Sequence, residues 1–185
     1  MAKTRTMNIR PNAWPNRLLI SLVIGAVILL TVIALLSRAF GENELRVAKP
    51  APAFVLKDAH GQTIKLADFK NRALIVWFLV TSDKPCQKQM GILNDLVKAC
   101  GETNLAVLGL ALDQTSPQAS KIYAEQQHLY FTLLPAYYEM VQAFGSLTSI
   151  PTLFVIDKEQ NIIQTYVGVT QTNVLDADVK AILRQ

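Results

Sequence analysis

The feature that most constrains the fold is an unbroken apolar run over residues 73–80, followed within a few residues by a helical pattern. A strand with no polar residue on either face is typical of the centre of a sheet that helices cover on both sides. After a short polar turn, Met90, Leu93 and Val97 recur at helical spacing, which predicts a helix over about 84–99 that Gly101 ends. The chain is therefore expected to place a central strand directly before a helix.

The rest of the chain alternates between strand and helix patterns. Residues 105–112 form a second apolar strand, and a helix is expected over about 117–127, with Ser116 as its N-cap. Further strands are expected at 54–56, 62–66, 131–134, 152–157 and 162–167, and further helices at 137–144 and 173–183. This order predicts an α/β class with a mixed central sheet and helices on both faces.

An apolar segment near the N-terminus predicts a membrane anchor. The nineteen residues from Leu18 to Leu36 are uncharged, and as a helix they would span roughly 28 Å, close to the hydrocarbon core of a bilayer. Basic residues without acids precede the segment, which places the N-terminus in the cytoplasm and the remainder on the extracytoplasmic, periplasmic side. A cleaved signal peptide is the alternative, with Ser37-Arg38-Ala39 as a loose cleavage site, but signal h-regions are typically about 7–15 residues long.

These observations divide the chain into four parts: a cytoplasmic segment (1–17), a transmembrane anchor (18–37), a linker (38–50) and a folded domain (51–185). Residues 1–40 hold five Lys/Arg and no Asp/Glu, whereas 41–185 hold thirteen Lys/Arg and fourteen Asp/Glu, a net charge of −1. The basic character therefore belongs to the membrane flank, and no nucleic-acid partner is expected.

The two cysteines, Cys86 and Cys100, are predicted to remain unpaired within one chain. On one helix they would lie about 21 Å apart along the axis, too far for a disulfide. Cys100 is expected to be a small packing residue. His60 and His128 fall in a turn and a loop without ligand-spaced partners, so neither a metal nor a cofactor is expected.

Three segments resemble the thioredoxin-like superfamily, in particular membrane-anchored thiol-disulfide oxidoreductases of the TlpA type and the wider redoxin (AhpC/TSA-like) group. They are the junction Pro85-Cys86-Gln87-Lys88-Gln89-Met90, the stretch 149–158 around Pro151, and the hairpin 160–168. The resemblance implies a thioredoxin-like fold from about residue 48 onward. It also implies a cis Ile150–Pro151 bond, with Ile150, Pro151 and Thr152 presenting backbone to an extended substrate.

The redox motif of that family is incomplete here. Aligned on Cys86, the C-x-x-C motif has Asp83 in place of its first, nucleophilic cysteine, and Gln89 replaces the usual carboxylate. A dithiol cycle within one chain is therefore excluded. Asp83 can be interpreted as a helix N-cap. Alternatively its carboxylate could modulate Cys86 as a base, but its negative charge would raise the pKa of that thiol and disfavour the thiolate. Cys86 can be read as a reactive thiol or as an inert buried residue.

Three functions follow from this reading. The first is thiol-disulfide oxidoreduction through Cys86 with protein or small-molecule thiols and disulfides, including a disulfide-linked dimer through Cys86. The second is a non-catalytic binding module that keeps the peptide groove. The third is a peroxiredoxin-like peroxidase, but that motif, P-x-x-x-T-x-x-C, has Leu79 and Asp83 at its first two fixed positions here, and Pro151 occupies the place of the activating arginine.

Overall fold

The structure, a computed structural model, describes residues 24–32, 49–145 and 147–184. The chain divides into two units, residues 1–46 and 47–185. In the first unit the described part is a helix over residues 24–32. Among the residues that are described, no helix is both long and apolar enough to cross a bilayer. Parts of the expected chain division lie outside the described residues: the cytoplasmic segment, residues 18–23 and 33–37 of the anchor, and residues 38–48 of the linker.

The second unit is built on a six-stranded mixed sheet with the strand order β1-β8-β7-β4-β5-β6. Its strands are β1 (Lys49–Pro50), β4 (Ala73–Leu79), β5 (Leu105–Ala111), β6 (Thr132–Pro135), β7 (Thr152–Ile156) and β8 (Asn161–Val167). Strands β4, β5 and β6 run parallel, whereas β7 is antiparallel to both β4 and β8. The central position of β4 matches the prediction from its apolar sequence, since all seven of its residues are buried.

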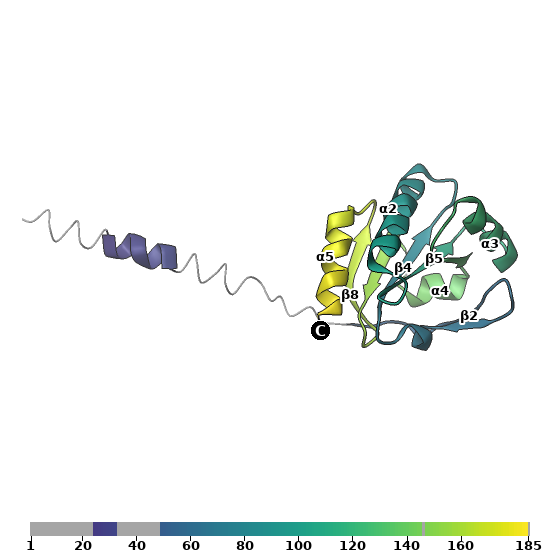
Figure 1. The fold of residues 1–185 in the computed structure, drawn as a ribbon, viewed down its shortest axis with the longest axis horizontal. Coiled ribbons are helices and arrows are strands. Elements are labelled where there is room, and N and C mark those ends of the chain that lie inside the picture. Colours follow the sequence, from purple (N-terminus) through teal and green to yellow (C-terminus); the bar gives the residue numbers. More distant parts are fainter. Residues whose placement is uncertain (1–23, 33–48, 146, 185) are drawn as a thin grey trace, which may run out of the picture. The chain divides into compact units, whose positions relative to one another are not determined.

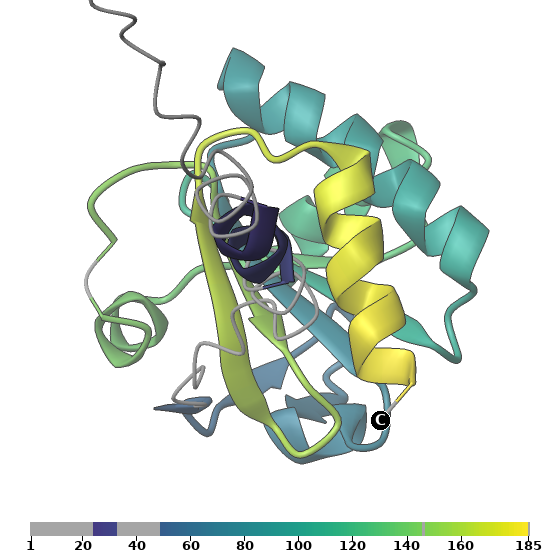
Figure 2. The same ribbon diagram turned by 90° about the vertical axis from the view of Figure 1, so that its left-hand side faces the viewer.

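Helices cover both faces of this sheet (Figures 1 and 2). They are α2 (Lys84–Cys100), α3 (Pro117–Gln126), α4 (Tyr138–Ala143) and α5 (Thr172–Leu183). Side chains of α2 and α5 share one apolar core with alternate residues of β4, with α3 packed at its border. The opposite face of β4 packs against α4 and against a small second sheet of β2 (Val55–Lys57) and β3 (Thr63–Lys65). The thioredoxin-like α/β arrangement expected from the sequence is therefore present.

Two elements were not anticipated. A short 3-10 helix, η1 (Leu66–Phe69), follows β3 and buries Leu66. The end of the expected linker forms β1, whose Lys49 and Pro50 pair with Ile162 and Asn161 of β8. Two residues containing a proline carry no strand periodicity, so only the partner strand reveals this pairing.

Candidate functional site

Cys86 lies in the first turn of α2, immediately after the central strand β4. Asp83 is the N-cap of this helix, because its carboxylate Oδ2 accepts a hydrogen bond from the backbone N–H of Cys86 at 3.1 Å. Pro85 lies in the first turn, where its missing N–H costs no helical hydrogen bond. The residue that stands in place of the family's first cysteine therefore fixes the start of the helix.

The thiol of Cys86 is buried and is held in its neutral form. Its side chain has 0% exposure and belongs to the core between the sheet and α2. Burial raises the pKa of Cys86 from the ordinary value of 9.0 to about 11; a backbone hydrogen bond from Val80 opposes this rise, and Asp83 adds to it. At neutral pH very little thiolate is present, so in this conformation Cys86 is a weak nucleophile.

A carboxylate from the neighbouring strand holds the loop before α2. Asp113 follows β5, and its carboxylate accepts hydrogen bonds from the backbone N–H of Thr81 at 2.9 and 3.0 Å and from Thr81 Oγ1 at 2.6 Å. Burial alone would raise the pKa of Asp113, but these bonds and those from the N–H groups of Ser82 and Asp113 itself lower it. The negative charge is thus fixed at the loop, where it also contributes to the raised pKa of Cys86.

The carbonyl of Thr81 is held from the opposite side. It accepts hydrogen bonds from the hydroxyl of Tyr123 on α3 at 3.1 Å and from Nε2 of Gln87 on α2 at 3.2 Å. A cavity of about 510 Å³ lies beside this loop between α2 and α3, and none of its lining residues is charged; Asn94 and Gln127 are among them. The loop is therefore bound to three elements and borders an uncharged polar cavity.

The second part of the site is the loop before β7. The Ile150–Pro151 peptide bond is cis. The carbonyl of Pro151 accepts a hydrogen bond from the N–H of Gly168 at 2.7 Å, and Thr152 Oγ1 donates to the carbonyl of Ser149 at 2.6 Å. Pro151 and Thr152 are buried and Ile150 is half-buried, so the loop offers only a limited surface to a partner.

Gln89 joins the loop after β8 to α2. Its Oε1 accepts a hydrogen bond from the backbone N–H of Thr170 at 2.7 Å, and both residues are buried. Its Nε2 is buried with no hydrogen-bond partner among the described residues. Since Gly168 binds Pro151 and Thr170 binds Gln89, the segment 168–170 connects the Pro151 loop with the helix that carries Cys86.

The remaining residues singled out from the sequence lie elsewhere. Cys100 is half-buried at the end of α2; burial and the charge of Asp176 raise its pKa, while Lys180 opposes the rise. His60 is exposed and its Nε2 lies 3.2 Å from Nζ of Lys121. Within the described residues, no group of three His, Cys, Asp or Glu side chains could hold a metal ion.

Sequence reasoning missed three contributors to the site: Asp113, Tyr123 and Thr170. Asp113 carried a usable signal, because polar residues at the carboxyl ends of adjacent parallel strands meet at one edge of the sheet. Tyr123 and Thr170 carried none, since their contacts depend on how α3 and the loop after β8 pack against α2.

Fold and site together define a thioredoxin-like redoxin domain whose redox position holds one cysteine. The model of the AhpC/TSA family matches residues 47–165, and the chain belongs to this family. Similar proteins include the thiol-disulfide oxidoreductase ResA of Bacillus thuringiensis subsp. konkukian (strain 97-27), 32% identical over 142 residues, which are 76% of this chain and 81% of the relative. The chloroplastic peroxiredoxin Q of Populus jackii is 33% identical over 84 residues, only 45% of this chain and 38% of that protein.

Solved structures show the same fold. A thiol:disulfide interchange protein of the thioredoxin family from Chlorobium tepidum TLS aligns with a TM-score of 0.66 at 28% identity, covering 74% of this chain and 97% of that one. A putative thioredoxin from Neisseria meningitidis aligns with a TM-score of 0.65 at 29% identity, covering 75% of this chain and 92% of that one. Both solved chains consist almost entirely of the matching part, and residues 47–185 contain both apolar cores. This part of the chain therefore folds as a unit by itself.

Proposed function

We propose that the protein is a thiol-disulfide oxidoreductase that works outside the cytoplasm, anchored by Leu18 to Leu36, with Cys86 as the only thiol at its site. The observation that carries this proposal is the position of Cys86 in the first turn of α2, after the central strand. The similar proteins that match most of this chain are thiol-disulfide oxidoreductases, whereas the peroxiredoxin matches less than half of it. Residues 51–185 would form the functional domain, and the loop Ile150-Pro151-Thr152 would hold the backbone of a protein partner.

A single thiol can exchange only with sulfur that its partners supply. Cys86 loses its proton to solvent, and its sulfur attacks one sulfur of a partner disulfide; a mixed disulfide forms and the other partner sulfur leaves as a thiolate. A second external thiolate then attacks the mixed disulfide and releases Cys86, so that the electrons come from the external thiol. If the second thiolate is Cys86 of another copy of the chain, its attack on the mixed disulfide gives a dimer linked through Cys86; the partner sulfur leaves as a thiolate, so the partner disulfide is the oxidant.

The burial of Cys86 requires the loop before α2 to open for this chemistry. The thiol has 0% exposure and a pKa of about 11, so attack in the closed conformation is slow. The uncharged cavity beside Thr81 and Ser82 would accommodate a neutral polar segment of the partner next to the opened loop.

A second function is favoured by the same burial. A non-catalytic binding module would bind a partner through the loop at Ile150 and Pro151 and use Cys86 only as a core residue. The N-cap formed by Asp83 and the raised pKa of Cys86 support this alternative, because both stabilise a closed, unreactive site.

One experiment separates the two functions. Residues 47–185 carrying Cys100→Ala are incubated with oxidised glutathione at pH 7 to 9.5, and mixed disulfides are identified by intact-protein mass spectrometry; Cys86→Ser in the same background is the control. An oxidoreductase forms the adduct at Cys86 in the folded state, at a rate that rises with pH, and releases it on addition of a thiol. Modification that occurs only in denaturant supports the binding module and contradicts the oxidoreductase.

The membrane anchor is tested separately. The full chain expressed in a Gram-negative host is expected in the membrane fraction after washing with alkaline carbonate, at its uncleaved mass, with residues 51–185 open to protease from the periplasmic side. A soluble product shortened near residue 39 would support the signal peptide instead.

A further inference from the structure

A cavity of about 520 Å³ lies between the turn at residues 58–61, helix α3 and strand β6. It shares only Leu129 with the cavity beside the Cys86 loop, so it is a separate feature of the described domain. A volume of this size falls within the range of small-molecule sites, roughly 300–1,000 Å³. Nothing in the redox proposal uses it.

The floor of the cavity is apolar. Leu133 of β6 forms its base with 3% exposure, and Phe131 and Leu129 continue the apolar surface. Leu134 also borders the cavity, but its side chain packs into the core on the other face of the sheet. Ala124 of α3 lines the wall with a single methyl group. These side chains would contact the hydrocarbon part of a ligand. Binding would remove the apolar surface of the ligand, and the small exposed apolar area of the cavity, from water.

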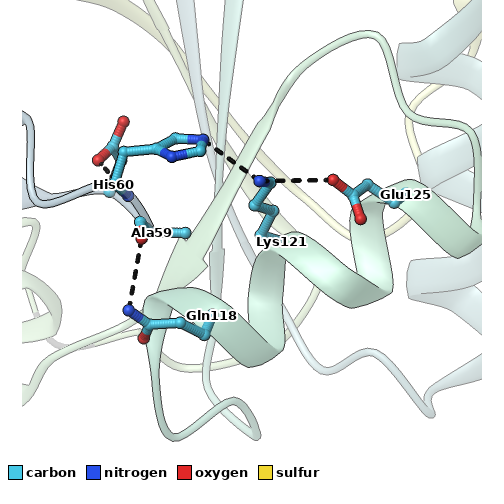
Figure 3. A network of polar contacts seen from close by, with 6 residues as sticks. Ala59, His60, Gln118, Lys121 and Glu125 are labelled. Atoms are coloured by element: carbon cyan, nitrogen blue, oxygen red, sulfur yellow. Dashed lines mark hydrogen bonds and ion pairs between the residues drawn. The ribbon is translucent and has the colours of Figure 1, made fainter.

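A polar network forms one side of the rim (Figure 3). Nζ of Lys121 lies 3.2 Å from Nε2 of His60 and 3.6 Å from Oε1 of Glu125, so the ammonium group sits between the two side chains. Gln118 Nε2 donates to the carbonyl of Ala59 at 3.4 Å, which joins the turn to α3. The turn and the helix thus hold the rim in place without a ligand.

The turn itself is fixed by Asp58. Its Oδ1 accepts hydrogen bonds from the backbone N–H groups of His60 and Gln62, both at 2.8 Å. The negative charge of Asp58 is therefore directed to the backbone of the turn. It does not pair with the ammonium group of Lys121 in any contact of the described residues.

The rim offers donors and a positive charge to a ligand. An ammonium group has three hydrogens, and His60 and Glu125 accept two of them. Nε2 of His60 accepts from Lys121 in the tautomer that carries its proton on Nδ1. The partner Glu125 is 65% exposed and lies 3.6 Å away, so this surface pair is weak and its ammonium group remains available.

We propose that this cavity binds a small amphiphilic carboxylate, with its hydrocarbon part on the Leu133 floor and its carboxylate at Lys121 and His60. A carboxylate has two acceptor oxygens and a charge opposite to that of Lys121, and the hydrocarbon part matches the floor. The site does not involve Cys86, so the proposal stands whether or not the redox function holds.

The probe for the test is 3-phenylpropionate, titrated into residues 47–185 and followed by amide chemical shifts in NMR spectra. Saturable binding with a dissociation constant on the order of 1 mM is expected, as suits a ligand of about eleven non-hydrogen atoms. The shifts are expected at Ala124, Leu129 and the 58–62 turn. The neutral 3-phenylpropanamide is expected to bind about fivefold more weakly, because it lacks the charge-assisted contact.

Two variants locate the site. Lys121→Gln is expected to weaken binding of the carboxylate about fivefold. The matched control is Lys180→Gln, because Lys180 also forms an i,i+4 ion pair, with Asp176 on α5, and it should leave binding unchanged. Ala124→Phe is expected to fill the cavity and abolish binding of both probes.

The proposal is overturned by any of three results. They are absence of saturable binding to the unmodified domain, equal affinity for the carboxylate and the amide, and equal effects of the two lysine substitutions. Because Lys121 is 44% exposed at its side chain, its substitution leaves the fold intact even if Ala124→Phe proves unstable.

Discussion

The carboxylate of Asp83 accepts a hydrogen bond from the backbone N–H of Cys86 at 3.1 Å, so this side chain caps the N-terminus of α2. The same carboxylate contributes to the raised pKa of the Cys86 thiol, behind the larger effect of burial. A single side chain thereby stabilises the helix and disfavours the thiolate. These two effects can be separated by substitution.

Asp83→Asn is expected to keep the cap and remove the charge. Asn is about as good an N-cap as Asp, so the free energy of unfolding should change by less than about 0.5 kcal/mol, whereas Asp83→Ala should lose about 1 kcal/mol. Both variants should lower the pKa of Cys86, since the charge is gone in each. Urea unfolding and the pH dependence of alkylation, both in a Cys100→Ala background, measure the two quantities. An unchanged Cys86 pKa in both variants would mean that Asp83 contributes nothing to the raised value.

Asp83→Cys is expected to restore an oxidisable pair. Positions 83 and 86 lie three residues apart at the helix start, and the side chain of Asp83 already reaches the backbone N–H of Cys86, so a small adjustment allows a disulfide. The variant should gain dithiol-dependent reduction of insulin that the unmodified chain lacks. Asp83→Ser, which keeps a capping oxygen but adds no sulfur, is the control. Failure of the variant to form the 83–86 disulfide under air would show that the site has lost more than its first cysteine.

The Asp113–Thr81 contact is expected to make stability depend on acidity. The folded-state pKa of Asp113 is lowered, so its contribution to stability is present above the unfolded pKa of about 3.9 and disappears as the pH falls through the folded value. Asp113→Asn should cost about 0.5–1 kcal/mol at pH 7, allowing for the exposure of this residue to solvent. The difference from the unmodified chain should shrink below about pH 4. Urea unfolding at pH 7 and pH 3 gives the comparison, and a difference that persists at pH 3 would contradict it.

More of the fold than of the site could be predicted from the sequence. The apolar sequence of β4 determined its central position, because only a strand buried on both faces tolerates such a composition. The sequence also indicated the capping role of Asp83, as one of two alternative roles for that residue. By contrast, the contact between Thr81 and Asp113 spans 32 positions and depends on the parallel register of β4 and β5. The full burial of Cys86 depends on the docking of α2, which no local pattern specifies.

Gln89 is expected to stabilise the site through Thr170. Replacement by Leu has nearly the same volume but leaves the buried N–H of Thr170 without an acceptor, at a cost of about 1–3 kcal/mol. The unpartnered Nε2 of Gln89 is removed in the same step, which offsets part of this cost, so the lower end is expected. Urea unfolding of Gln89→Leu beside Gln126→Leu, a matched substitution at an exposed position of α3, measures the effect. Equal loss in both variants would contradict a specific role for Gln89.

The burial of Cys86 should make the domain less stable at high pH. Its folded-state pKa is raised from 9.0 to about 11, so the folded state keeps the proton after the unfolded state has lost it. Stability is then full below about pH 8.5 and falls by about 1.4 kcal/mol per pH unit between the two pKa values. Lysines and tyrosines also titrate in this range, so the informative quantity is the difference between the Cys100→Ala domain and the same domain with Cys86→Ala. At pH 8 the Cys86→Ala domain is expected to be the less stable of the two, because the substitution leaves a cavity in the core. The difference in the free energy of unfolding between the two domains, measured by urea unfolding, should become smaller from pH 8 to pH 10.5. If this difference stays constant with pH, Cys86 titrates with its ordinary pKa in the folded domain and therefore reaches solvent. That result would favour the oxidoreductase over the binding module.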